Sequence, residues 1–322
     1  MKRIIIIVLV FTLSIIALPF STMAAEMLVP VGRVVGLYLG DNSMVVAGFD
    51  SILGAAAQKA GLQVGDKLIA INGRSVNCSE DISNVLRSTT GKVEVRYMRN
   101  GKIKSAKFEP VTTKDGPRLG IFLQQGISGV GTVTWYDPDT GAFGALGHGV
   151  NASNGQLITV GKGSIYSASV LSVIKGKAGD PGQLLGNLRD KSSIGSIEKN
   201  IQQGIFGKMD IRWDGDALPV AQRDEIRTGS AVIRSNVKGD EVQEYSVEIL
   251  KIYPNSKATG RNLLIKVTDT ALLQATGGIV QGMSGSPIIQ DGKLVGAVTH
   301  VLVNDPTTGY GIFIENMLDA AA

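Results

Sequence analysis

The chain has 322 residues, of which 41 are glycine and only 5% are aromatic, a mixture that favours a turn-rich β protein over a helical bundle. Its formal charge of +4 includes Lys2 and Arg3 at the N-terminus; the other 30 basic side chains nearly balance the 28 acidic ones, which excludes the strongly basic surface of a nucleic-acid-binding protein. A single cysteine, Cys78, excludes an intramolecular disulfide, and two histidines do not support a His-based zinc centre, so we expect no metal and no cofactor.

The first 25 residues have the pattern of a targeting segment. Lys2 and Arg3 give a positive start, residues 4–20 are apolar, and small residues follow at 21–25. This pattern predicts a signal peptide over residues 1–25. Because the apolar run is also near the length of a membrane span, an anchor formed by residues 4–20 is the alternative. In both cases we expect the rest of the chain to be exported from the cytoplasm.

Residues 31–113 predict one small domain that contains both helices and strands. The expected elements, in chain order, are a helix over 53–60 closed by Gly61, a buried strand over 68–71 reversed at Asn72-Gly73, a helix over 80–88, and a hairpin that turns at Asn100-Gly101. Breaker residues at 112–117 then predict a linker.

The run from Ala60 to Gly73, AGLQVGDKLIAING, resembles the PDZ domain family, because its glycines and its Asn-Gly turn stand at fixed offsets between apolar positions. The resemblance implies that an extended peptide, from a partner or from the chain itself, binds by adding a strand. By the same resemblance the groove lies between residues 40–46 and the helix over 80–88. The alternative is a PDZ-shaped spacer that binds nothing.

Residues 118–322 predict a second domain that is mainly β. Turn signals separate its short strand-like runs, and no long amphipathic helix appears before the last residues. This organisation favours a β-barrel or a β-sandwich. The expected strands lie at 119–124, 130–136, 156–160, 164–174, 208–213, 244–252, 262–267, 286–290 and 294–303.

The run QGMSGSP at 281–287 has the features of an acyl-transfer site. Such a site needs a hydroxyl on a tight turn beside backbone N–H groups that point at the developing oxyanion, and flanking glycines permit that turn. The run resembles the Gly-x-Ser-Gly-Gly-Pro segment of trypsin-like peptidases, which implies that Ser284 is the nucleophile and that the N–H groups of Gly282 and Ser284 form the oxyanion hole. Ser286 is the competing nucleophile, and a plain glycine-serine turn is the structural alternative.

A serine–histidine mechanism must take its base from His148 or His300, the only histidines in the sequence. His148 lies on a bend of small residues and precedes Ser284, which is the order found in trypsin-like enzymes, so we expect His148 to be the base. His300 lies in an apolar strand after the serine run. By analogy with trypsin-like folds, Thr299, His300 and Val301 would border the substrate groove; a buried, hydrogen-bonded histidine is the alternative.

A third catalytic residue would orient the imidazole and stabilise its positive form. Spacing alone does not choose among the aspartates between His148 and Ser284. Asp269 stands out because it follows the strand-like residues 263–267 just before the serine run, and Asp210 is the runner-up. Either carboxylate is also able to cap a turn.

Taken together, the leader, the PDZ-like run, Gly147-His148-Gly149 and the stretches GGIVQGMSGSP (277–287) and VGAVTHVLVNDP (295–306) resemble the stage IV sporulation protein B family. The resemblance covers almost the whole chain. It implies a PDZ domain over 31–113, then a trypsin-like double β-barrel peptidase over 118–322, with His148, Asp269 and Ser284 as its triad.

The same resemblance implies a signalling serine endopeptidase of sporulation. Such an enzyme is exported across the forespore membrane into the intermembrane space, cuts itself, and clips a membrane-bound regulatory subunit of an intramembrane metalloprotease, which activates a sigma factor. An envelope quality-control peptidase is one alternative, although those usually carry the PDZ domain after the peptidase. A non-catalytic PDZ scaffold is the other.

Overall fold

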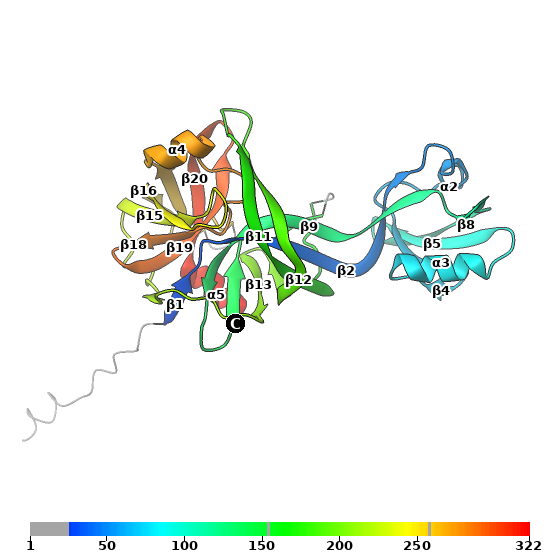
Figure 1. Ribbon diagram of the computed structural model, residues 1–322, viewed down its shortest axis with the longest axis horizontal. Coiled ribbons are helices and arrows are strands. Elements are labelled where there is room, and N and C mark those ends of the chain that lie inside the picture. The colour runs from blue at the N-terminus through cyan, green and yellow to red at the C-terminus, as the bar shows by residue number, and fades with distance from the viewer. Residues whose placement is uncertain (1–25, 153–154, 257–258) are drawn as a thin grey trace, which may run out of the picture.

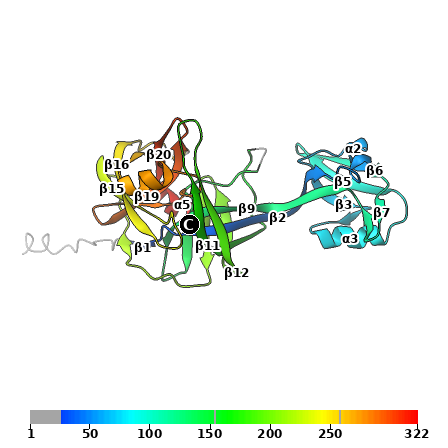
Figure 2. The ribbon, with the colours of Figure 1, turned by 45° about the horizontal axis from the view of Figure 1, so that its top comes forward.

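Two lobes joined by a pair of long strands make up the protein. The computed structural model describes residues 26–152, 155–256 and 259–322, so the leader predicted over 1–25 lies outside the described residues. The connecting strands are β2 (Val34–Phe49) and β9 (Ile121–Tyr136), which run from the larger, all-β lobe to the smaller one (Figures 1 and 2). In the part of the chain that the structure describes, no helix is long and apolar enough to cross a membrane.

The larger lobe begins with a closed ring of antiparallel strands. Its strands follow one another in the order β9-β10-β13-β12-β11-β2, and β2 closes the ring by pairing with β9 as well. Apolar side chains such as Val35, Phe143 and Ile165 are fully buried inside it. The ring strands other than β2 and β9 are β10 (Ala142–Ala145), β11 (Lys162–Ile174), β12 (Gln183–Ile201) and β13 (Gly204–Met209). Two short strands extend the sheet from β9, β1 (Met27–Pro30) and then β14 (Leu218–Pro219).

A second closed barrel completes the larger lobe, in the order β15-β16-β17-β20-β19-β18. Its strands alternate as expected for a barrel wall: in β16, Tyr245, Val247 and Ile249 are buried and their neighbours are exposed. The double β-barrel predicted for this region is therefore confirmed. The elements are β15 (Gly229–Ser235), β16 (Gln243–Ile252), β17 (Leu263–Val267), α4 (Thr270–Thr276), β18 (Pro287–Gln290), β19 (Lys293–Leu302), β20 (Asp305–Phe313) and α5 (Ile314–Ala321).

The smaller lobe has the predicted PDZ elements. The two Asn-Gly turns are confirmed, because Asn72, Gly73, Asn100 and Gly101 all have positive φ angles, as the tight turns of β-hairpins require. The predicted helices are also confirmed: the first is shorter than expected, and the second is shifted by one residue. The elements are α2 (Ala55–Lys59), β3 (Lys67–Ile71), β4 (Arg74–Ser75), α3 (Ser79–Arg87), β5 (Val93–Arg99) and β6 (Lys102–Phe108).

The structure divides the chain differently from the expected boundary at residue 31. The first part of β2 belongs to the first barrel, where Val35 pairs with Gly131 of β9 and Leu39 pairs with Gly163 of β11. The PDZ lobe is therefore inserted into the peptidase fold after its first strands. Sequence patterns do not reveal this arrangement, because the run Gly40-Asp41-Asn42-Ser43 suggests a turn, whereas β2 continues through it from the barrel to the PDZ sheet.

The expected linker is also different. Residues 112–117 fall in a small antiparallel hairpin formed by β7 (Val111–Thr113) and β8 (Gly116–Arg118). The polar and breaker residues that suggested a linker form the turn of this hairpin, where Gly116 has a φ of 108°.

Candidate active site

Ser284 stands on the turn between α4 and β18, and glycines shape that turn. Gly282 and Gly285 have φ angles of 98° and 96°, in the region that favours glycine. A Cβ added to Gly285 would lie 2.0 Å from the carbonyl oxygen of Thr132, so this position admits no larger residue without movement of β9. The sequence thus places Ser284, half-buried, at the point where the second barrel meets the first.

The backbone around Ser284 leaves two N–H groups available. The amides of Met283 and Gly285 donate to the carbonyls of Val280 and Val298, at 3.1 and 2.7 Å. Among the described residues, the amides of Gly282 and Ser284 have no hydrogen-bond partner. These are the two groups that the sequence suggested for the oxyanion hole, and a free pair of donors beside a serine is what that function requires.

Thr132 of β9 fixes the orientation of this turn. Its hydroxyl donates to the carbonyl of Gly282 at 2.7 Å, and its own amide donates to the carbonyl of Ser284 at 3.1 Å. Its carbonyl accepts from the amide of Leu146 at 3.1 Å, two residues before His148. Thr132 is fully buried. Sequence reasoning missed it, because a threonine in an alternating strand has no signature of its own.

His148 follows β10 on a sharp bend, where Leu146 and Gly147 both have a φ of 68°. Its Nδ1 lies 3.0 Å from the carbonyl oxygen of Gly149. Because a carbonyl can only accept, Nδ1 carries the proton in the neutral ring, and Nε2 is left free to accept one. Burial lowers the pKa of His148, although the Gly149 carbonyl partly opposes this effect. His148 is therefore neutral at pH 7, as a general base must be.

His300 lies beside His148, with 5.1 Å between their ring centroids and an angle of 38° between their planes. Desolvation lowers the pKa of His300 to about 4, and the charges of His148 and Arg261 act in the same direction. Arg261 itself stacks on Tyr310, which pairs with His300 across β19 and β20. His300 thus adds a second uncharged imidazole at the site, and its side chain remains exposed.

Two of the predicted groove residues of β19, Thr299 and His300, contact Ser284 and His148, respectively. Ser284 donates its hydroxyl to the carbonyl of Thr299 at 2.8 Å, so in this structure the hydroxyl is not bonded to His148. Thr299 is buried and Val301 is half-buried against the core of the second barrel. Transfer of the proton to His148 requires rotation of the Ser284 side chain away from Thr299.

The structure does not bring Asp269 into contact with His148. Asp269 caps the N-terminus of α4, where its carboxylate accepts from the amide of Leu272 at 2.9 Å and from that of Ser246 at 3.4 Å. Among the described residues, neither Asp269 nor the runner-up Asp210 shares a hydrogen bond with His148. The carbonyl of Gly149, not a carboxylate, holds the His148 ring.

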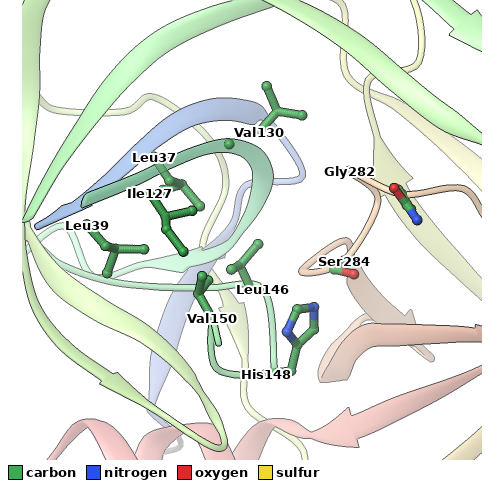
Figure 3. Close-up of a pocket in the computed structure, with 11 residues that line it drawn as sticks. Leu37, Leu39, Ile127, Val130, Leu146, His148, Val150, Gly282 and Ser284 are labelled. Carbon is green, nitrogen blue, oxygen red and sulfur yellow. The ribbon is translucent and has the colours of Figure 1, made fainter. Parts of the chain in front are cut away.

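A pocket of about 280 Å³ opens beside the two central residues (Figure 3). His148 and Ser284 point into it from different barrels, and Gln281 and Gly282 form its edge. Ser286, the competing nucleophile, is fully buried and does not line the pocket. The other lining residues are Leu37, Leu39, Ile127, Gly129, Val130, Leu146 and Val150.

Comparison with protein families finds two matches. The family described as SpoIVB peptidase S55 matches residues 115–318, and the PDZ domain family matches residues 51–96. A search of curated proteins finds no match. The two family matches cover both lobes, and the first includes His148, Asp269 and Ser284.

Solved structures similar to the chain include two bacterial proteases and one PDZ domain. The active form of the Rv3671c protease from M. tuberculosis is 16% identical, with 60% of this chain and 72% of that chain covered and a TM-score of 0.37. The HtrA-type protease AlgW with a decapeptide is 15% identical, with 65% and 57% covered and a TM-score of 0.37. The PDZ domain of the SdrC-like protein from Listeria monocytogenes is 23% identical, with 26% and 87% covered and a TM-score of 0.22.

Proposed function

Since this chain belongs to the SpoIVB peptidase S55 family and is a serine peptidase with a PDZ domain, we propose that Ser284 is its nucleophile and His148 its general base. The observation that carries this assignment is the shared pocket: residues far apart in the sequence, from two different barrels, meet there beside two free backbone amides. A serine, a neutral imidazole and an anion-binding turn are the parts that acyl transfer needs.

The reaction follows from these positions. Ser284 Oγ attacks the carbonyl carbon of the scissile peptide bond while its proton passes to His148 Nε2, and the amides of Gly282 and Ser284 stabilise the oxyanion. His148 returns the proton to the leaving amine as the C–N bond breaks, which gives an acyl-enzyme. Water, deprotonated by His148, then attacks the acyl carbon and releases the second product together with Ser284.

Asp269 has a more limited role in this proposal than the sequence suggested. Its carboxylate is engaged at the start of α4, and the Gly149 carbonyl already selects the Nδ1–H tautomer of His148. An aspartate in a triad has those same two tasks, orientation and tautomer selection, and it also stabilises the positive form of the imidazole. In this proposal the Gly149 carbonyl takes over the first two tasks. We therefore assign Asp269 to the placement of α4, the helix that leads into the Ser284 turn.

The biological setting we propose is sporulation signalling outside the cytoplasm. The leader pattern at 1–25 supports export across the forespore membrane, and the family supports self-cleavage followed by cleavage of a membrane-bound regulatory subunit of an intramembrane metalloprotease. Release of that metalloprotease then activates a sigma factor. A regulated protease fits a site whose serine hydroxyl is bonded away from its base.

The PDZ lobe supplies the second binding site of the proposal. The expected groove at residues 40–46 is wrong, because Met44 and Val45 pair with β3 on one edge and with β9 on the other, which leaves no edge for a peptide. The start of β9 is different: among the described residues, Ile121 and Leu123 pair only with β2, and both pack in the same core as α3. We propose that a peptide adds to this edge of β9.

The test compares wild type with Ser284→Ala in an endospore-forming host whose own copy has been deleted. The wild-type protein is expected to shorten itself, to convert the regulatory subunit to a fragment, and to switch on a reporter that depends on the sigma factor. Ser284→Ala should do none of these, with a loss of several powers of ten in rate, on the order known for triad serines.

Ser286→Ala is the matched control, since it removes a neighbouring hydroxyl that lies outside the pocket. It should keep self-cleavage and the reporter signal. Normal self-cleavage without any fragment of the subunit would contradict the signalling role but keep the peptidase. Cleavage by Ser284→Ala at the wild-type rate would contradict the peptidase assignment itself.

A further inference from the structure

The pocket beside Ser284 is apolar, and the first barrel builds it. Leu37, Leu39 and Leu146 are buried and form its floor, whereas Ile127 and Val130 are half-buried at its rim. Figure 3 shows these side chains on one side of the pocket and His148 and Ser284 on the other. Its volume of about 280 Å³ exceeds the roughly 150 Å³ of an apolar cavity that binds benzene, so a leucine or phenylalanine side chain has room in it.

The pocket exists because one position in its wall carries no side chain. Leu37 stands directly opposite Gly129 in the β2–β9 ladder, and Leu39 stands opposite Ile127. Opposed residues point to the same face of a sheet, so a side chain at position 129 would project next to Leu37, toward the pocket. A Cβ added to Gly129 meets no described atom within 4 Å. Gly129 therefore leaves open a space that its neighbours line with apolar atoms.

The wall next to His148 is held in a strained conformation. Leu146 has a φ of 68°, which is uncommon for a bulky side chain. Its amide is tied to the carbonyl of Thr132, and a Cβ added to Gly131 would lie 2.2 Å from Leu146 Cδ2. Strain of this kind persists where the surroundings enforce it, and it is concentrated at functional sites. The pocket is therefore formed before substrate binds.

The position of the pocket indicates which part of a substrate enters it. On the second barrel, and among the residues that the structure describes, β19 pairs only with β20 beyond Val298, so its other edge near Thr299 is open to a substrate strand. The pocket lies on the other barrel, on the side of His148, which passes its proton to the leaving amine. A substrate held along β19 up to the scissile bond thus continues over the first barrel.

We propose that this pocket binds a large apolar side chain, such as that of leucine or phenylalanine, at the residue immediately after the scissile bond. The substrate class is therefore peptides with an apolar residue at the new N-terminus of the cleavage product. This inference rests on the proposed peptidase function, because it assumes that Ser284 attacks the bond before that residue.

The experiment digests a complex peptide mixture with the protein and identifies every cut by mass spectrometry. For wild type, the position after the cut should be enriched in leucine, phenylalanine and similar residues. In pairs of peptides that differ only there, leucine should be cut about tenfold or more faster than alanine, the scale on which apolar pockets discriminate side chains. Gly129→Phe fills the pocket, so its cuts should instead precede glycine, alanine or serine.

Ser128→Phe is the matched control, because the same bulky residue then stands one position away, at an exposed residue that does not line the pocket. It should keep the wild-type preference. Ile127→Ala, which widens the rim, provides a second variant and should favour phenylalanine over leucine relative to wild type. Both effects would be absent if the pocket played no part in recognition.

The outcomes separate the two claims. If Ser284→Ala cuts as well as wild type, or wild type cuts nothing, the proposed peptidase site is wrong and this inference is lost with it. If wild type cuts through Ser284 but shows no apolar preference after the scissile bond, or shows it only before that bond, the pocket assignment alone is overturned. If both Gly129→Phe and Ile127→Ala keep the wild-type cleavage preference, the pocket assignment alone is likewise overturned.

Discussion

At the scale of single residues, the chemistry depends on the neutral state of His148. Its partial burial lowers its pKa below the ordinary 6.5, and the Gly149 carbonyl fixes its tautomer. His300, with a pKa lowered to about 4, brings no charge to the site at neutral pH. The base is therefore ready at the pH of most compartments without a carboxylate partner.

The pH dependence of kcat/KM tests this state of His148. The base works only when neutral, so activity is lost as pH falls through its pKa, and because that pKa is lowered we expect the midpoint of the acid limb below 6.5. His300→Glu places a carboxylate beside His148, which favours the imidazolium and should move the midpoint to higher pH. His300→Gln is the uncharged control and should leave it in place.

A wild-type midpoint at or above pH 6.5 would contradict the burial argument. Equal midpoints in His300→Glu and His300→Gln would show that the side chain at position 300 does not face His148 in solution.

The sequence identified the proposed reacting residues but not the groups that hold them. Ser284 was proposed as the nucleophile because glycines lie close to it on both sides, and His148 as the base because the sequence has only two histidines. The Gly149 carbonyl and Thr132 were not identified, since a backbone acceptor has no sequence signature and a threonine suits any strand. Asp269 was chosen for its position before the serine run, and that position is also where α4 needs a cap.

At the scale of elements, β9 organises the site. Thr132 joins it to the Ser284 turn by two hydrogen bonds and to the His148 bend by a third. The start of β12 supports the same turn from another side, where the amide of Leu184 donates to the carbonyl of Gln281 at 2.8 Å. The free amide pair of the turn is thus oriented by neighbouring strands of the first barrel.

Thr132→Val tests this support. It keeps the shape of the side chain and removes the hydroxyl, which leaves the buried carbonyl of Gly282 without its donor and frees the adjoining peptide to rotate. We expect kcat to fall about ten- to a hundredfold with little change in KM, since the oxyanion donors act mainly in the transition state. Thr132→Ser restores the donor and should retain most activity; equal rates for Thr132→Val and wild type would contradict this role.

Two substitutions distinguish a helix-capping role of Asp269 from a catalytic role. Asparagine caps helices about as well as aspartate, so Asp269→Asn should keep both stability and most activity, whereas Asp269→Ala should lower the free energy of unfolding by about 1 kcal/mol. Denaturant unfolding and kcat measured on the two variants provide the check. A loss of roughly ten-thousandfold in Asp269→Asn with normal stability would show that the carboxylate orients His148 during catalysis.

Among the elements, some strands with apolar alternation were predictable, but the alternating run at 208–213 is a strand only as far as Met209, where β13 ends. The run at 244–252 became β16 almost unchanged. β12 was missed because most of its first two thirds is exposed and shows no period. β20 was missed because it starts with Asp305-Pro306 and contains Gly309 and Gly311, a composition that indicates a turn. The structure needs both glycines, because a Cβ atom at either position would lie 2.6 or 3.0 Å from a carbonyl oxygen of β19.

At the scale of the whole molecule, the two lobes share two long strands, β2 and β9. β9 offers an open edge in the PDZ lobe at Ile121 and Leu123, lines the pocket at Gly129, and holds the Ser284 turn at Thr132. β2 runs beside it (Figure 2) and contributes Leu37 and Leu39 to the pocket floor. In the proposed binding mode, a peptide on the PDZ lobe would add to the same strand that lines the pocket.

The domain order was predicted only in part, because the two lobes share the strands β2 and β9. The PDZ-like run and the serine run identified the two modules, but no sequence pattern indicated that residues before the PDZ lobe complete the first barrel. That information is carried by long-range pairing, such as Val35 with Gly131. A short strand with alternating apolar and polar residues is able to pair with the edge of either sheet.

The most direct test of the central claim is the covalent labelling of the full-length protein with a fluorophosphonate, followed by intact mass measurement and peptide mapping. The proposed site predicts one adduct, on Ser284, with labelling absent in Ser284→Ala and slowed by powers of ten in His148→Ala. An adduct on Ser286, or equal labelling rates in wild type and His148→Ala, would contradict the assignment of Ser284 and His148 as the reacting pair.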